Sequence, residues 1–158
     1  ELPPLNFDRH LLVQALRNLV RNAIDALSDQ ASGARPGEPV GQVSLEAALA
    51  TDGVQITVRD NGPGIPEEIL EHIFEPYYTT KERGTGLGLM VVYRIVAEHR
   101  GRLHVDTRPS EGTSFVITLP LHIKPVRLLS ERTRTDAPLI VQGRRLSSDE
   151  RDRLLKQK

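Results

Sequence analysis

Asp60-Asn61-Gly62-Pro63-Gly64-Ile65 decides the fold of this chain, because it places an acidic group and two glycines directly after a strand-like run from Val54 to Val58. At the exit of a strand, the carboxylate of Asp60 can accept a hydrogen bond from an exocyclic amine such as that of adenine. Gly62 and Gly64 let the backbone pass close to a flat ligand. The stretch therefore predicts one wall of a binding site for a base.

A second glycine-rich stretch, Gly84-Thr85-Gly86-Leu87-Gly88-Leu89, follows two dozen residues later. It opens onto a helix predicted from Leu89 to His99, whose first amides would point outward at anionic phosphate. Glycine-rich turns are often ordinary loops, so either stretch alone fits a purely structural role as well as a binding role. The two together indicate a nucleotide site.

Between Leu11 and Leu27, apolar residues recur at the helical period and form one stripe. Asn18, Asn22 and Asp25 fall along one edge of this stripe. Amides are poor helix formers that need partners, and a lone Asn would be explained by a capping contact. Two of them, four residues apart on the same rim, favour a pair of oxygen ligands for Mg²⁺. The apolar stripe itself consists of Leu12, Ala15, Leu16, Leu19, Ala23, Ala26 and Leu27.

Four motifs, taken in order, resemble the N, G1, F and G2 boxes of the GHKL superfamily in the form found in sensor histidine kinases. They are Asn18-x-x-x-Asn22-Ala23, Asp60-x-Gly62-x-Gly64, Ile73-Phe74-Glu75-Pro76-Tyr77-Tyr78-Thr79-Thr80-Lys81 and Gly84-Thr85-Gly86-Leu87-Gly88-Leu89. The segment from Glu111 to Pro120 resembles the last strand of the same domain. The resemblance covers roughly residues 5 to 121, and it implies a catalytic and ATP-binding domain at 1–121, followed by a C-terminal tail or linker at 122–158.

The resemblance implies roles at the base and at the metal. Asn22, helped by Asn18, would coordinate Mg²⁺ bridging the phosphates of ATP. Asp60 would read the adenine amine, with Thr113 supporting it through a hydroxyl or a water molecule. The base would enter beside Gly62, Gly64 and Ile65.

The resemblance also implies a lid over the triphosphate, from Glu75 to Gly84. Phe74 would anchor one end of the lid in the apolar layer. Lys81 would neutralise the terminal phosphate, a role that phosphoryl transfer requires and that makes Lys81 and Asn22 the expected catalytic residues. Two hydroxyls, Thr79 and Thr80, would assist Lys81. The triphosphate would lie on the amides of Gly84, Thr85, Gly86, Leu87, Gly88 and Leu89.

Two positions depart from the family pattern. Gyrase-like, mismatch-repair and chaperone relatives carry a Glu that activates water at the position of Asn18, and an amide cannot act as a general base. This favours a kinase over a hydrolase. Asp25 stands where histidine kinases often have a phosphate-binding Lys, and Ala26 stands where an aromatic residue is frequent. More of the phosphate binding is therefore left to the lid and the glycine-rich loop.

The predicted function is that of the ATP-binding catalytic domain of a two-component sensor histidine kinase. It would transfer the γ-phosphoryl group to a histidine on a separate dimerisation domain, with a response regulator as an indirect downstream partner. No histidine here lies in an acceptor-like helix; the five are His10, His72, His99, His104 and His122. Two alternatives stay open: an ATP hydrolase switch of the gyrase or chaperone type, and a non-catalytic module that senses nucleotide or docks a partner.

Composition supports this prediction without specifying it. The chain has 158 residues, 38% of them hydrophobic, which is enough for one ordinary domain core. Its 21 basic and 21 acidic residues cancel, so no field favours nucleic acid or an anionic membrane surface. It has no cysteine and no apolar run near the ~20 residues that span a bilayer. We expect a cytoplasmic domain without direct membrane contact, whose parent protein carries any membrane anchor elsewhere.

The expected fold is an α/β two-layer sandwich, with a mixed sheet covered on one face by helices. The N-terminal half should hold a helix from Asp8 to Asp29, a loop from Ser32 to Gly41, and strands at Gln42–Ala50 and Val54–Asp60 joined by the turn Thr51-Asp52-Gly53. A short helix should begin after Pro66, and further strands should lie at Arg102–Thr107 and Thr113–Leu119. In the tail, Pro138–Val141 could be a strand, and Ser147 could begin a short polar helix.

Overall fold

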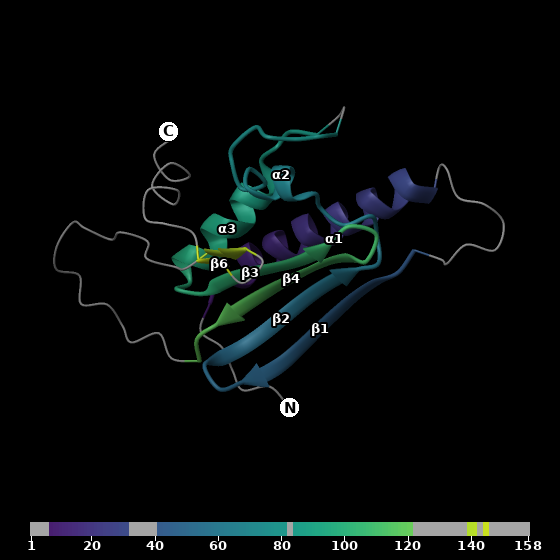
Figure 1. Cartoon of the computed structure of the whole chain (residues 1–158). Coiled ribbons are helices and arrows are strands. Elements are labelled where there is room, and N and C mark those ends of the chain that lie inside the picture. Colours follow the sequence, from purple (N-terminus) through teal and green to yellow (C-terminus); the bar gives the residue numbers. More distant parts are fainter. Residues whose placement is uncertain (1–6, 32–40, 82–83, 122–138, 142–143, 146–158) are drawn as a thin grey trace.

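The structure is a computed structural model that describes residues 7–31, 41–81, 84–121, 139–141 and 144–145. Figure 1 shows a long helix and a shorter helix lying against a twisted sheet, with a very short helix and a loop segment at one end. The helices are α1 (Arg9–Ala31), α2 (Glu67–Leu70) and α3 (Gly88–Glu98). The strands are β1 (Val43–Ala50), β2 (Gly53–Asp60), β3 (Arg102–Arg108), β4 (Gly112–Leu119), β5 (Leu139–Val141) and β6 (Arg144–Arg145).

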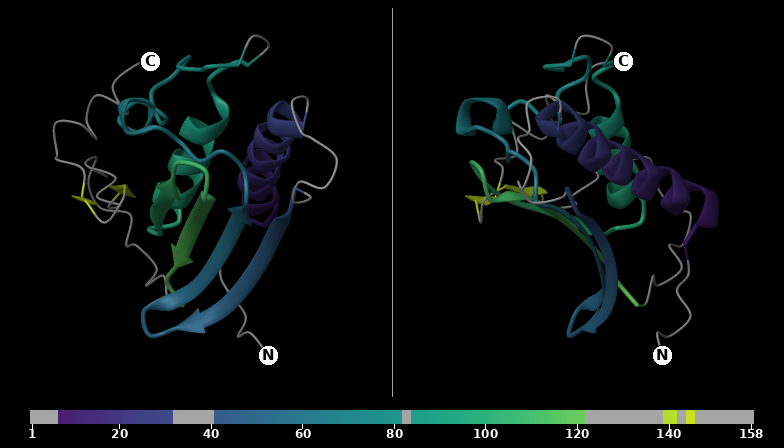
Figure 2. Two further views of the ribbon diagram at one scale, coloured as in Figure 1. Left: turned by 45° about the vertical axis from the view of Figure 1, so that its right-hand side comes forward. Right: turned by 90° about the vertical axis from the view of Figure 1, so that its right-hand side faces the viewer.

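The strands form one mixed sheet in the order β1-β2-β4-β3-β5-β6. Neighbouring strands are antiparallel except β3 and β5, which are parallel. Two views about the vertical axis show that α1 and α3 both lie on the same face of the curved sheet (Figure 2). This confirms the predicted two-layer sandwich. The register pairs Asp60 at the end of β2 with Thr113 at the start of β4, so the two predicted base-site residues meet at one end of the sheet.

Alternation along the three central strands builds the core. One face of each strand is apolar and faces the helices, while intervening residues such as Thr57 and His104 are more exposed. Against this face pack Ala15 and Leu19 of α1 and Val92 and Val96 of α3. Each fully buried large side chain contributes about 1.5–3 kcal/mol of hydrophobic stabilisation. The inward residues of the sheet are Val54, Ile56, Val58, Leu103, Val105, Phe115, Ile117 and Leu119.

The helix and strand boundaries lie close to those that the sequence predicts. Helix α1 begins one residue after Asp8, whose Oδ1 accepts hydrogen bonds from the amides of His10 (2.8 Å) and Leu11 (3.3 Å). These two backbone donors at the helix start lower the pKa of Asp8, as expected for an N-cap carboxylate. Helix α1 ends at Ala31, two residues later than expected. The predicted loop from Ser32 to Gly41 lies outside the described residues, apart from Gly41 itself.

The C-terminal region contributes two short strands to the sheet. Residues 139–141 form β5, within the predicted strand at 138–141, and they pair with Leu103–Val105 of β3. Strand β6 pairs with β5. The short polar helix predicted from Ser147 lies outside the described residues. The β3 edge of the sheet is therefore extended by residues that the family resemblance does not include.

Candidate nucleotide-binding site

Asp60 is held at the end of β2 by two backbone donors. Its Oδ1 accepts hydrogen bonds from the amide of Gly62, at 2.9 Å, and from the amide of Thr113, at 3.2 Å. The residue is only 7% exposed. Because both donors belong to backbone tied into the sheet and its turn, the orientation of this carboxylate is fixed before any ligand arrives.

Burial raises the pKa of the Asp60 carboxyl, and the two backbone hydrogen bonds from Gly62 and Thr113 partly offset that rise. The second oxygen, Oδ2, accepts no hydrogen bond from any residue in the described ranges. Oδ2 is not one of the fully buried atoms that lack a partner, so it stays open to solvent and to a ligand amine. The geometry therefore fits a group that donates a hydrogen bond, as adenine does.

Glycine is required at two positions beside Asp60, for different reasons. A Cβ on Gly62 would lie 2.9 Å from Asp60 Oδ1 and within 3.7 Å of Ala26 Cβ on α1. It would also lie 3.6 Å from Leu27 Cδ2, so the backbone at Gly62 packs closely against the end of α1. Gly64 has φ +73°, and a Cβ there would lie 2.1 Å from the carbonyl oxygen of Arg108, so this glycine closes the turn against β3.

Thr113 contacts Asp60 directly through its backbone. Its backbone amide, and not its hydroxyl, donates to the carboxylate. The Thr113 hydroxyl lies 3.0 Å from Thr107 Oγ1, which also contacts the Gly112 carbonyl (3.1 Å) and accepts from the amide of Ile65 (2.9 Å). If the single proton of Thr107 goes to Gly112, then Thr113 must donate to Thr107. Thr107 is a residue that the motifs did not reveal, although strand alternation with Leu103 and Val105 does point it inward.

Asn18 and Asn22 lie half-buried on the rim of α1 that faces the start of α3. The side-chain amide nitrogen of Asn18 donates to the carbonyl of Gly88, at 3.3 Å. Neither its Oδ1 nor the side chain of Asn22 hydrogen-bonds to any residue described in the structure. Two amide oxygens on one rim fit Mg²⁺, which usually takes few protein ligands and completes its shell with water and phosphate. The described residues hold no cluster of three or more His, Cys, Asp or Glu that would form a site by itself.

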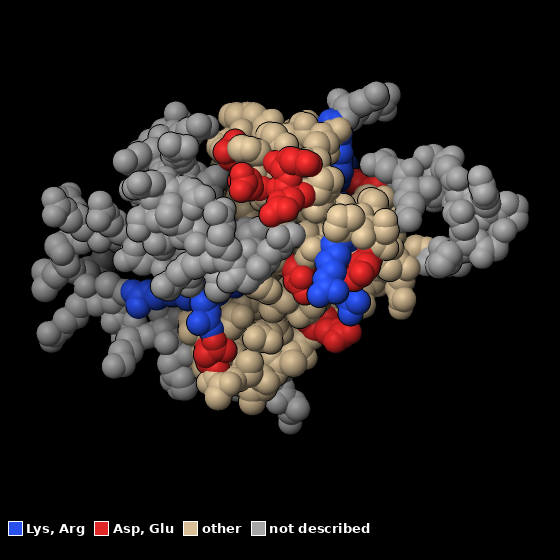
Figure 3. Space-filling view, viewed as in Figure 1, with Lys and Arg blue, Asp and Glu red and all other residues tan. Residues whose placement is uncertain are grey.

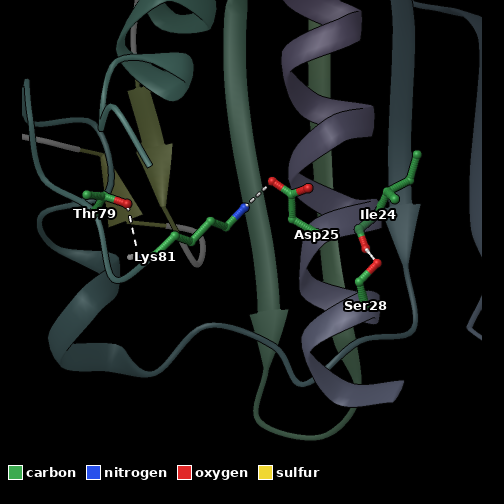
Figure 4. Close-up of polar contacts among 5 residues, drawn as sticks. All are labelled: Ile24, Asp25, Ser28, Thr79 and Lys81. Atoms are coloured by element: carbon green, nitrogen blue, oxygen red, sulfur yellow. Dashed lines mark hydrogen bonds and ion pairs between the residues drawn. The ribbon is translucent and has the colours of Figure 1, made fainter. Parts of the chain in front are cut away.

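The segment after α2 begins in the core and ends near α1. Phe74 is 2% exposed and its ring packs against Tyr93 of α3, with ring centroids 6.2 Å apart. Further along, the backbone amide of Lys81 donates to Thr79 Oγ1 at 3.1 Å. The Nζ of Lys81 lies 2.8 Å from Asp25 Oδ2, and Figure 4 shows the lysine reaching from its loop toward the helix. The predicted anchor at Phe74 is therefore buried, and Lys81 contacts the helix that carries both asparagines.

Gly84 and Gly86 have packing reasons to be glycine. A Cβ on Gly84 would lie 2.3 Å from Thr79 Oγ1, and one on Gly86, with φ +66°, would lie 2.4 Å from the carbonyl carbon of Tyr77. The Tyr77 amide also donates to the Gly86 carbonyl, at 3.1 Å. These two glycines thus tie the loop before α3 to the lid segment.

Helix α3 begins at Gly88 after Leu87, and its N-terminus has no side-chain cap. The first amides of a helix lack carbonyl partners within the helix. Around Gly88 the nearest atom to an added Cβ would be Asn18 Cγ, at 3.9 Å, so the backbone is open here. The remaining predicted contacts in this region, Thr80 and Thr85, are exposed, and Leu89 is half-buried. The arrangement leaves uncapped, accessible amides beside the two asparagines, which is the chemistry of an anion site.

Helix α2 and the residue after it carry a group of acidic side chains. Acidic side chains gather over α2 in the space-filling view (Figure 3). Glu67 and Glu68 form the first turn of α2, and Glu71 follows it as an exposed residue.

Comparison with known proteins agrees with this geometry. Residues 7–123 match the family described as histidine kinase-, DNA gyrase B- and HSP90-like ATPase. The chain belongs to this family.

Its relatives lie on the histidine kinase side. Sporulation kinase A of Bacillus subtilis (strain 168) is 41% identical over 116 residues, covering 73% of this chain and 18% of that protein. Sensor histidine kinase ZraS of Escherichia coli (strain K12) is 40% identical over 122 residues, covering 77% of this chain and 24% of that protein. The chain thus spans less than a quarter of the length of these relatives.

Solved structures give the same answer. The nucleotide-free catalytic domain of histidine kinase ThkA superposes with a TM-score of 0.60 at 34% identity, covering 74% of this chain and 70% of that one. Family and relatives together show a sensor histidine kinase catalytic domain of the GHKL type. None of the helices in the described part of the chain is long and apolar enough to cross a membrane.

Proposed function

We propose that this domain binds ATP with Mg²⁺ and transfers the γ-phosphoryl group to a histidine on a separate dimerisation domain. The observation that carries the proposal is the contact of Asn18. This residue occupies the position of the water-activating Glu of hydrolytic relatives. Its side-chain amide donates a hydrogen bond to the Gly88 carbonyl at 3.3 Å. An amide cannot take a proton from water, so the site supports positioning and charge neutralisation without activating water.

Each part of the site has a distinct task in this proposal. Asp60 accepts the hydrogen bond of the adenine amine through Oδ2, while Gly62, Gly64 and Ile65 shape the entrance for the base. Asn22 and Asn18 would hold Mg²⁺, which supplies neutralisation of the phosphate charge when bound. Lys81 supplies a cation at the terminal phosphate, beside the hydroxyls of Thr79 and Thr80. The residues from Gly84 to Leu89 offer backbone amides to the phosphates.

The wider assignments rest on the same comparison. We propose that residues 1–121 are the catalytic domain and that residues 122–158 are a C-terminal tail or linker. The partners are ATP, the histidine-bearing dimerisation domain of a parent kinase and, downstream, a response regulator. The family match ending at residue 123 and the named kinase relatives support this division. A cytoplasmic location without nucleic-acid or direct membrane contact fits such a role.

The test supplies the missing half of the kinase. The purified chain should hydrolyse ATP very slowly and should not label itself. Mixed with a dimerisation domain that carries its acceptor histidine, it should transfer label that is acid-labile and base-stable. A dimerisation domain with that histidine changed to Gln is the control. Steady turnover of ATP by the chain alone would favour the hydrolase alternative, and nucleotide binding without turnover or transfer would favour a sensing or docking module.

A further inference from the structure

The contact between Asp25 and Lys81 links the helix of the two asparagines to the lid. Their charged atoms, Oδ2 and Nζ, are 2.8 Å apart, although 56 residues separate them in sequence. Figure 4 shows both side chains extended toward each other across the space between α1 and the loop. The contact is thus a specific bridge between two elements that the proposed function places on opposite sides of the phosphates.

The position of Asp25 makes the contact competitive. Asp25 lies three residues after Asn22 and on the same rim of α1, while Lys81 is the cation proposed for the terminal phosphate. One ammonium group has to serve both anions, so the carboxylate and the phosphate compete for it. The side chains of Lys81 and Asp25 are 33% and 40% exposed, so water screens the pair and the contact is easily exchanged.

We infer that Asp25 is a positioning residue that holds Lys81 when no terminal phosphate is present and competes with that phosphate when it binds. This inference rests on the proposed function and adds a determinant of discrimination between ATP and ADP. In the free and ADP-bound states, Asp25 fastens the end of the lid to α1. When a terminal phosphate binds, it replaces Asp25 as the partner of the Lys81 ammonium group, because it carries more negative charge than a carboxylate. The aspartate therefore weakens the preference for ATP that Lys81 provides.

The main experiment measures discrimination by the whole chain. Calorimetry with Mg²⁺ gives the Kd of ADP and of AMP-PNP, a non-hydrolysable analogue that has the terminal phosphate. The Kd of ADP divided by the Kd of AMP-PNP should rise roughly three- to tenfold in Asp25→Asn, which removes the charge and keeps the shape. Asp25→Glu should keep the ratio near that of the wild type, because it restores the carboxylate. Asp106→Asn, the same change at an exposed site on β3, should leave the ratio unchanged.

A double-mutant cycle shows whether Asp25 acts through Lys81. Lys81→Gln should lower the ratio, and Asp25→Asn should then have no further effect in the Lys81→Gln background. Hydrogen exchange on the free protein gives a readout that needs no nucleotide. The amides of Tyr77 and Lys81 should exchange faster in Asp25→Asn than in the wild type, and Asp106→Asn should not change them.

The outcomes separate this inference from the proposed function. An unchanged ratio in Asp25→Asn, in a wild type that prefers the analogue, overturns the inference and leaves the function standing. Weaker analogue binding in Asp25→Asn also overturns it, since Asp25 would then assist the phosphate or the metal. Unchanged amide exchange in Asp25→Asn would show that Asp25 does not hold the lid in the free protein. A wild type that binds neither nucleotide overturns the proposed function and this inference together.

Discussion

The two ends of the site are built in different ways. At the base end, Asp60 is 7% exposed and is held by backbone amides of Gly62 and Thr113. At the phosphate end, Lys81 is held by a side chain, Asp25, and about a third of the lysine side chain is exposed. The base end is thus set by the register of β2 and β4, whereas the phosphate end depends on side chains that can change partners.

This difference matches what each end has to do. A site that reads a base benefits from a preorganised acceptor, because no free energy is then spent on ordering it at binding. A site that follows a phosphate through binding, transfer and product release needs contacts that can be exchanged. The comparison predicts that variants at the base end abolish recognition without altering the lid, and that variants at the phosphate end alter discrimination without altering the fold.

The largest effect is expected from Asp60→Asn. Gly62 and Thr113 donate to Oδ1, so the asparagine must place its oxygen there and its NH₂ group where Oδ2 was. The NH₂ group of the asparagine and the amine of adenine, both hydrogen-bond donors, then face each other. Loss of a hydrogen bond to a charged group costs about 1.5–3 kcal/mol, which is about a 10- to 150-fold loss of ATP and ADP affinity. Calorimetry measures the affinity, and thermal unfolding should show no loss of stability at neutral pH, because a buried charge is removed.

Asp106→Asn is the matched control for that change, with unaltered nucleotide affinity expected. ADP binding that survives intact in Asp60→Asn would show that Asp60 does not read the base. A large fall in melting temperature would instead show that the carboxylate is structural.

Two glycines sharpen the comparison through stability alone. Gly64→Ala forces a Cβ toward the Arg108 carbonyl at φ +73°, and such strain costs about 1–3 kcal/mol. Gly88→Ala meets nothing nearer than Asn18 Cγ at 3.9 Å, and alanine favours a helix start more than glycine, so the free energy of unfolding should stay or rise by up to about 1 kcal/mol. Denaturant unfolding measures both. Equal destabilisation by the two changes would contradict a rigid base end beside an open phosphate loop.

The sequence predicts the layers of the fold well and proposes the site residues, but it does not predict which atoms meet. Asp60 and Thr113 could be identified because each belongs to a local motif. The use of the Thr113 amide could not, because it depends on the pairing of β2 with β4. Likewise, the sequence identifies Asp25 only as the absence of a phosphate-binding Lys. Its contact with Lys81 spans two elements far apart in sequence, and no periodicity encodes it.

Asn22→Ala tests the metal at the phosphate end. If Asn22 supplies an oxygen to Mg²⁺, the variant should lose about tenfold in ATP affinity with Mg²⁺ present, roughly one lost hydrogen bond or ligand contact to a charged group. In excess chelator, the variant and the wild type should bind ATP equally. Calorimetry in both buffers gives the four values. Unchanged affinity in Asn22→Ala with Mg²⁺ would rule out the metal assignment, while hydrogen exchange at β2 and β4 should stay as in the wild type.

The smallest expected effect is a pH dependence at the base end, with opposite signs for binding and for folding. Burial raises the pKa of Asp60 above the ordinary aspartate value of 3.8. On acidification, the proton must go to Oδ2, because Oδ1 already faces two donors, and a protonated Oδ2 no longer accepts from the base. ATP affinity should therefore fall as pH drops through a range above 3.8, whereas Asp60→Asn shows only the titration of the nucleotide itself.

For folding, a raised pKa means that the native state holds the proton more tightly than the unfolded chain does. The stability contribution of Asp60 is then fully present below pH 3.8 and is lost as pH rises through the native pKa, so the wild type should gain stability relative to Asp60→Asn on acidification. Calorimetry and denaturant unfolding across this range measure the two trends, and parallel trends in place of opposite ones would show that another group titrates.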